Sequence, residues 1–191
     1  MNDVNIYITF VIHVIVGKLG EADALMRSYR TNILRIAARL AHRMPVAPMQ
    51  LYRGLLLDPE IGMHKVPFTF LSWSEDLDVA RWFASPQTEI GLEVGRLKPT
   101  YRGYLITREP ALPSQLLFHH SWRALFPFEA AAMIHPAFDV ELARQVHWNL
   151  HTQREVITLP LDEDPTPLAI DVLNTAQLDE RFAPPWHERG L

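Results

Sequence analysis

The chain has 191 residues, of which 48% are hydrophobic and 21% are charged, and its formal net charge is −4. This length matches one domain and is enough to bury about 70% of the unfolded surface. The weakly acidic balance gives no indication of nucleic-acid binding, and the absence of cysteine excludes a disulfide framework, a thiol nucleophile and a zinc site built on thiolates.

The first third of the chain contains one apolar run and one predicted helix. Residues 6–16 form an apolar run, too short to span a bilayer, that we interpret as a buried strand or helix, with a signal-peptide core as the alternative. Residues 21–43 carry apolar side chains at helical spacing and end before Pro45, which predicts a helix. Its five arginines indicate a solvated face, although a basic face leaves an anionic target open: Arg27, Arg30, Arg35, Arg39 and Arg43.

Short strands and one helix are predicted in the middle of the chain. Residues 49–53, which follow Pro48, and residues 68–72 are predicted strands, separated by a loop over residues 58–67 that glycine and proline interrupt. Ser74 or Asp76 is expected to cap a short helix that ends near Pro86. Residues 91–97 and 103–107 are two further predicted strands, and Pro110 and Pro113 are expected to end the second.

The last third is less regular. Residues 129–134 are either a helical turn or a strand, and residues 155–161 alternate as a strand before an acidic, proline-rich tail over residues 162–191. No repeat or linker divides the chain. We therefore predict one domain over residues 1–191, with a helical N-terminal region over residues 1–45, a core at about 48–161 and the tail.

Three short segments place polar side chains in strand-forming surroundings, where an unpartnered charge would be costly to bury: Tyr52-Arg53-Gly54, Ser72-Trp73-Ser74 and Gln153-Arg154-Glu155. Residues two apart in a strand point to the same face, which pairs Ser72 with Ser74 and Gln153 with Glu155. An arginine fork suits phosphate oxygens, and a serine can orient a ligand hydroxyl or a neighbouring carboxylate. A glutamate can bind a sugar hydroxyl while it stabilises adjacent positive charge. The three segments therefore predict nucleotide-sugar chemistry.

In this order and rough spacing, the segments resemble the mono-ADP-ribosyltransferases of the arginine-serine-glutamate class, which includes many bacterial toxins. The resemblance covers about residues 48–161 and has one departure, Trp73, where the family prefers threonine. It implies an α+β fold with an ADP-ribosyltransferase-like split, mostly antiparallel β-sheet core and flanking helices. It also implies NAD as co-substrate and no metal.

The resemblance assigns a role to each site residue. Arg53 would bind the dinucleotide phosphates and brace the nicotinamide ribose, while Ser72 would hold Glu155 and the ligand in place. Glu155 would bind the ribose 2′-hydroxyl and stabilise the oxocarbenium-like cation as nicotinamide leaves. Gln153 would contact the acceptor, as in the Rho-targeting exoenzyme branch, which makes arginine a less expected acceptor. Gly54, Ser74 and Arg96 complete the expected cofactor-binding set.

The resemblance also implies partners and a location. The acceptor would be a protein side chain or an RNA or DNA group, recognised by a loop over residues 148–152 that contains His151. The chain would act as a toxin or effector in the cytoplasm of its own cell or of a target cell, with a possible antitoxin partner and no membrane association.

Other interpretations remain open. With water as the acceptor, the same site would make an NAD glycohydrolase, and a decayed domain would be a nucleotide- or protein-binding module. Arg53 could pair with a surface carboxylate, Ser72 or Ser74 could cap a helix, and Gln153 could be a polar loop residue. The histidines show no HExxH pair and so predict no metal centre: His119, His120, His135, His147 and His151.

Overall fold

The computed structural model describes residues 2–57, 72–85, 102–111, 113–125, 146, 149–150, 152–159 and 168–173. These residues form α-helices and antiparallel strand pairs, in agreement with the predicted α+β class. The chain forms two compact units that exchange segments. Unit 1 comprises Met1–Met49, Phe68–Ser72 and Ala111–Pro165, and unit 2 comprises Gln50–Pro67, Trp73–Pro110 and Thr166–Leu191.

Unit 1 begins with α1 (Asp3–Ile15). The sequence predicted either a strand or a helix here, and the structure shows a helix. Every residue from Ile6 to Ile15 is buried, so the helix is enclosed around its whole circumference, with Thr9 and His13 as polar residues among apolar ones. Asn2 caps its first turn through Oδ1, which accepts from the Asn5 amide at 2.9 Å. Gly17, at φ 75°, supplies the left-handed residue that turns the chain after the helix.

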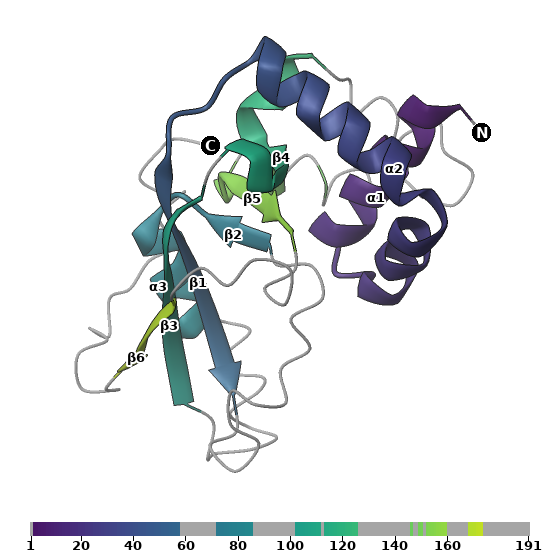
Figure 1. Cartoon of the computed structure of the whole chain (residues 1–191). Coiled ribbons are helices and arrows are strands. Elements are labelled where there is room, and N and C mark those ends of the chain that lie inside the picture. The colour runs from purple at the N-terminus through teal and green to yellow at the C-terminus, as the bar shows by residue number, and fades with distance from the viewer. Residues whose placement is uncertain are drawn as a thin grey trace. The chain divides into compact units, whose positions relative to one another are not determined.

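The predicted second helix is confirmed as α2 (Leu19–Arg43), which lies beside α1 in unit 1 (Figure 1). Its regular geometry is interrupted at Tyr29, where φ is −132° and ψ is 25°. All five arginines of this segment are exposed, as a solvated face requires. Among them, Arg27 contacts Asp23 and Arg35 contacts Asp3.

The rest of unit 1 is a strand pair with short 3-10 turns. β4 (Leu116–His119), which the sequence did not predict, pairs antiparallel with β5 (Glu155–Thr158). The turns are η2 (Pro113–Gln115) and η3 (His120–Ala124). The register shifts between Leu116 and Phe118, and Tyr7 of α1 donates its hydroxyl hydrogen to the Leu117 carbonyl there at 2.7 Å. The helix pair and the strand pair thus share one buried core.

Unit 2 holds the strand order β2-β1-β3-β6 except for the end residues Met49, Ser72 and Ala111, which belong to unit 1, and α3 (Leu77–Ala84) is its helix. The strands are β1 (Met49–Leu57), β2 (Ser72–Ser74), β3 (Arg102–Ala111) and β6 (Leu168–Leu173). β3 continues through Pro110 although proline was expected to end it. Its registered pairs with β6 run from Gly103 to Arg108, so the missing proline N–H lies beyond this ladder.

Two glycines allow α3 to approach the strands of unit 2 closely. A Cβ on Gly54 of β1 would lie 1.7 Å from the Ala80 carbonyl oxygen, and one on Gly103 of β3 would lie 2.1 Å from that of Ala84. The helix is capped as predicted, because Asp76 Oδ1 accepts from the amide of Asp78 at 3.0 Å. Its end at Ala84 agrees with the expected stop near Pro86.

Several predicted elements lie outside the described residues: the loop 58–67, the strand 91–97, the segment 129–134 and the end of the tail beyond residue 173. A section of the predicted tail is a strand, since β6 occupies Leu168–Leu173 and pairs with β3. Across the described ranges, no helix is both long and apolar enough to cross a membrane.

Candidate functional site

Ser72 and Glu155 meet in unit 1 although 83 residues separate them in the sequence. The Ser72 hydroxyl donates a hydrogen bond to Oε1 of Glu155. Glu155 is only 3% exposed, and a carboxylate buried to this degree requires polar partners. The contact joins two of the three segments that the sequence singles out.

Buried strand residues hold Glu155 in place. It is the first residue of β5, and Val156, Ile157 and Thr158 after it are all fully buried. Val156 pairs with His119 on β4, which anchors the strand immediately beyond the carboxylate. Low-dielectric surroundings strengthen the interaction of a carboxylate with nearby positive charge, so this position suits electrostatic stabilisation of a cation.

The turn before Glu155 differs from the extended chain that the sequence suggests. Asn149, Leu150 and Thr152 are helical, where a recognition loop was expected. Arg154 has φ 46°, a left-handed conformation that costs a non-glycine residue roughly 1–2 kcal/mol. Gln153 therefore precedes β5 in a turn, and strand alternation does not place it on one face with Glu155.

Gln153 is half-buried and makes two contacts with the last helical turn. Its backbone amide donates to the Asn149 carbonyl at 3.1 Å, and its side-chain Nε2 donates to Asn149 Oδ1 at 3.1 Å. The side chain is thus ordered by a specific neighbour. Asn149 lies within the predicted recognition loop 148–152, but no role of its own was expected, and the signals for it are that loop and its position four residues before Gln153.

Arg53, Gly54 and Ser74 belong to unit 2. Arg53 is half-buried on β1, next to Tyr52, which pairs with Ser74 of β2. Gly54 packs against α3, which gives it a structural role in addition to the predicted contact with a cofactor. Ser74 is 6% exposed, and its Oγ accepts from the Asp76 amide at 3.0 Å, so it forms the turn that leads into α3 while Asp76 is the cap.

Trp73, the departure from the family pattern, has a buried cationic partner. Trp73 is 2% exposed, and the guanidinium carbon of Arg108 lies 5.7 Å from its ring centroid. Arg108 is fully buried, and burial lowers its pKa. A cation–π contact with this degree of desolvation is worth about 2 kcal/mol. A threonine at position 73 could not make this contact, and nothing in the sequence indicated that Arg108 would be buried.

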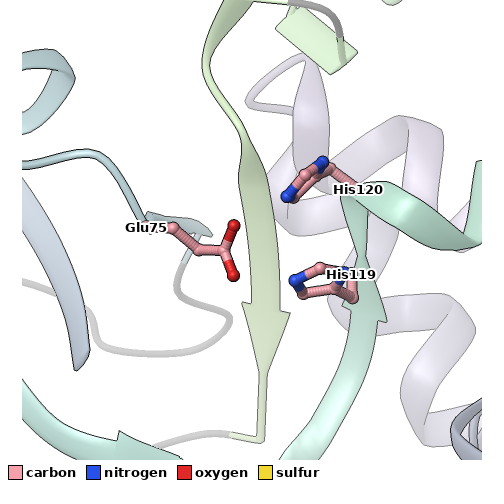
Figure 2. A group of neighbouring side chains, drawn as sticks. All are labelled: Glu75, His119 and His120. Atoms are coloured by element: carbon pink, nitrogen blue, oxygen red, sulfur yellow. The ribbon is translucent and has the colours of Figure 1, made fainter. Parts of the chain in front are cut away.

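His119 and His120 lie side by side in unit 1, with ring centroids 4.4 Å apart (Figure 2). His119 is 4% exposed, and its Nδ1 accepts from the Ser121 backbone amide at 3.2 Å, which makes it the N-cap of η3. Glu75, also labelled in Figure 2, belongs to unit 2. The structure thus gives His119 a structural role as a helix cap. His135, His147 and His151 lie outside the described residues, as do Arg96 and Trp148.

Comparison with known proteins gives no match: no protein-family model, curated protein or solved structure is significantly similar to the chain. Function therefore has to be inferred from the site residues themselves.

Proposed function

We propose that this chain is a mono-ADP-ribosyltransferase that moves ADP-ribose from NAD to a macromolecular acceptor and releases nicotinamide. The observation that supports this most is the hydrogen bond from Ser72 to the buried Glu155. This is the pairing that the resemblance implies, and it joins segments far apart in the chain. The toxin or effector role, the cytoplasmic location and a split ADP-ribosyltransferase-like sheet are parts of the same proposal.

The proposed reaction breaks the bond between C1′ of the nicotinamide ribose and the nicotinamide nitrogen. Nicotinamide leaves as a neutral molecule, and positive charge develops on the ribose. Glu155 accepts a hydrogen bond from the ribose 2′-hydroxyl and stabilises this charge, while Ser72 keeps the carboxylate oriented. The acceptor nucleophile then bonds to C1′ and loses its proton to solvent. Arg53 and, as a further phosphate contact, Arg96 would hold the dinucleotide.

Gln153 favours transfer over hydrolysis. Its side chain is held by Asn149 at 3.1 Å, next to the turn that leads to Glu155, and a contact dedicated to an acceptor has no use when water is the nucleophile. A protein side chain other than arginine fits this position. The exposed arginines of α2 leave an RNA or DNA acceptor as the other candidate, because clustered guanidinium groups attract phosphates.

The test is incubation of the purified protein with labelled NAD and a cell lysate, with and without nuclease. Glu155→Gln should lower nicotinamide release at least about 100-fold, because the carboxylate's charge is lost while its amide oxygen can still accept from Ser72. Glu21→Gln on the exposed face of α2 is the matched control and should retain activity.

Each outcome of this experiment has a distinct meaning. Label on a protein band or in the nuclease-sensitive fraction supports transfer and identifies the acceptor class. Free ADP-ribose alone would instead indicate the glycohydrolase, and intact NAD would indicate a binding module. Undiminished turnover by Glu155→Gln would reject the assigned role of the carboxylate.

A further inference from the structure

We infer that Asn149 is a positioning residue that holds the Gln153 side-chain amide in one orientation by linking it to the C-terminus of α1. The inference rests on the proposed function, in which Gln153 contacts the acceptor. It adds a residue outside the three recognised segments and connects the acceptor contact to the N-terminal helix.

Asn149 bridges two segments of unit 1. Its Nδ2 donates to the backbone carbonyl of Ile15 at 3.0 Å, across 134 residues of sequence, and its Oδ1 accepts from Gln153 Nε2 at 3.1 Å. Asn149 is 8% exposed, so water offers little substitute for either bond. Both the nitrogen and the oxygen of the Asn149 side-chain amide are therefore hydrogen-bonded to protein groups.

The end of α1 explains why Asn149 is needed there. The last carbonyls of a helix have no partner within the helix. Those of Ile12, His13 and Val14 accept from the backbone amides that follow the helix, at 3.0, 2.8 and 3.1 Å. The carbonyl of Ile15, the last residue of α1, accepts from Asn149. The side chain thus completes the capping of a buried helix.

This contact decides the orientation of both amides. A carbonyl oxygen can only accept, so the nitrogen of Asn149 must face Ile15 and its oxygen must face Gln153. Gln153 must then donate, which turns its nitrogen toward Asn149 and directs its own carbonyl oxygen away from Asn149. The helix end thereby determines which end of the Gln153 amide points toward a neighbouring acceptor group.

The same geometry selects glutamine over glutamate at position 153. A carboxylate there would face Asn149 Oδ1, and two acceptors without a hydrogen repel each other. A flip of Asn149 would only move the clash to the Ile15 carbonyl. A carboxyl group at this position is therefore favoured in its protonated form, which still has a hydrogen to donate.

The decisive test is the pH dependence of thermal unfolding of Gln153→Glu. We expect the introduced carboxyl group, which faces Asn149 Oδ1, to have a higher pKa in the folded than in the unfolded state, so the variant should match the wild type near pH 4 and lose stability as the pH rises. The melting temperature of the variant should lie below that of the wild type at pH 7, and this difference should be about 3–6 °C larger at pH 7 than at pH 4. In the Asn149→Ala background this extra loss should disappear.

Gln50→Glu is the matched control. Gln50 is exposed, and its Oε1 accepts from the Tyr52 hydroxyl at 3.0 Å, so a carboxylate retains the contact and should add no pH dependence. A Gln153→Glu variant that behaves like Gln50→Glu would overturn the inference, and so would equal pH dependence with and without Asn149. The comparison of Gln153→Glu with Gln50→Glu tests the inference even if Asn149→Ala fails to fold.

Activity provides a second readout that a purely structural role would not change. Asn149→Ala should lower kcat for transfer by up to about tenfold and shift the products toward free ADP-ribose. An unchanged ratio of transfer to hydrolysis would contradict the positioning role. The thermal measurement requires no turnover, so a wild-type protein that releases no nicotinamide would reject the proposed function alone.

Discussion

Among single residues, the proposed chemistry depends most on a buried carboxylate and the hydroxyl that orients it. The sequence identified Glu155 and Ser72 as polar groups in apolar strands, and the resemblance implied that they would meet. The structure shows the contact and the burial of Glu155. Strand alternation did not predict the position of Gln153, because Arg154 at φ 46° interrupts the extended chain before β5.

Removal of the orienting hydroxyl by Ser72→Ala should lower nicotinamide release by roughly 10–100-fold, because Glu155 is then less restrained relative to the ribose. The loss of a donor to a buried carboxylate should also cost about 1–3 kcal/mol of unfolding free energy. Steady-state kinetics and denaturant unfolding measure the two effects. Ser28→Ala, at an exposed position of α2, should change neither, and wild-type kinetics for Ser72→Ala would contradict the orienting role.

Tyr7 provides a pH-dependent prediction for unit 1. Burial raises the pKa of its phenol above the ordinary value near 10, so the fold favours the neutral form that donates to Leu117. This contribution is complete below about pH 10 and is lost as the pH rises through the folded-state pKa. Tyr7→Phe should lose about 1–3 kcal/mol at pH 7 and show a weaker decline in stability at alkaline pH.

Denaturant unfolding at pH 7 and above pH 10 measures both aspects of the Tyr7 prediction. Tyr29→Phe, at a position 43% exposed on α2, is the control and should leave both values unchanged. An equally steep alkaline decline in Tyr7→Phe and the wild type would show that Tyr7 is not its source.

Among the helices and strands, burial decided which ones the sequence could identify. The helical spacing of α2 predicted a helix because one face is buried and the other carries exposed arginines. The apolar run before it left helix and strand open because α1 is buried on all sides. β4 was missed because all four of its residues are buried, which removes the alternation typical of a half-exposed strand.

The packing of α3 on β1 makes Gly54 sensitive to substitution. Gly54→Ala would place Cβ 1.7 Å from the Ala80 carbonyl oxygen and 2.7 Å from the Ala84 amide nitrogen, and neither backbone atom can move without displacing the helix. We expect a loss of about 3 kcal/mol or more in unfolding free energy. Gly20→Ala in α2 meets no atom within 4 Å and should instead be neutral or stabilising by up to about 1 kcal/mol.

Denaturant unfolding of Gly54→Ala and Gly20→Ala compares the two sites directly. Equal stability of the two variants would show that α3 does not pack on Gly54 as closely as described.

Over the whole molecule, the two units do not follow the order of the sequence. The N-terminal helices, which the sequence set apart from the core 48–161, belong to the same unit as Ser72 and Glu155. Hydrogen bonds between described residues connect the N-terminal region of the chain to the later segments of that unit, among them Tyr7 to Leu117, Asn149 to Ile15 and Trp122 to Met44. The helices therefore belong to the framework that holds the proposed site.

A fragment of residues 48–191 should consequently fail to fold cooperatively. Without α1 and α2 it would expose the fully buried Phe118 and Trp122, together with the strand that carries Glu155. Circular dichroism and thermal unfolding should show no cooperative transition, whereas a chain of residues 2–191, which keeps the Asn2 cap, should unfold like the full chain. A fragment that unfolds cooperatively would show that the N-terminal helices are dispensable.

The sequence by itself determined the features that depend on local spacing and stop signals. Helical spacing and Pro45 identified α2, Asp76 and Pro86 delimited α3, and the strand-forming run that stops at Pro160 identified β5, although β5 is as fully buried as β4. The sequence also identified the residue types of the candidate site. These features can be predicted from the sequence because each depends on neighbours within a few residues along the chain.

Only the tertiary structure decided that α1 is a helix, that β4 pairs with β5, and that Asn149 links Gln153 to Ile15. The Ser72–Glu155 contact was implied by resemblance but is not encoded in any local pattern. The physical reason is the same in each case. Complete burial removes the periodicity that distinguishes helix from strand, and contacts across 83 or 134 residues arise from packing of the whole unit.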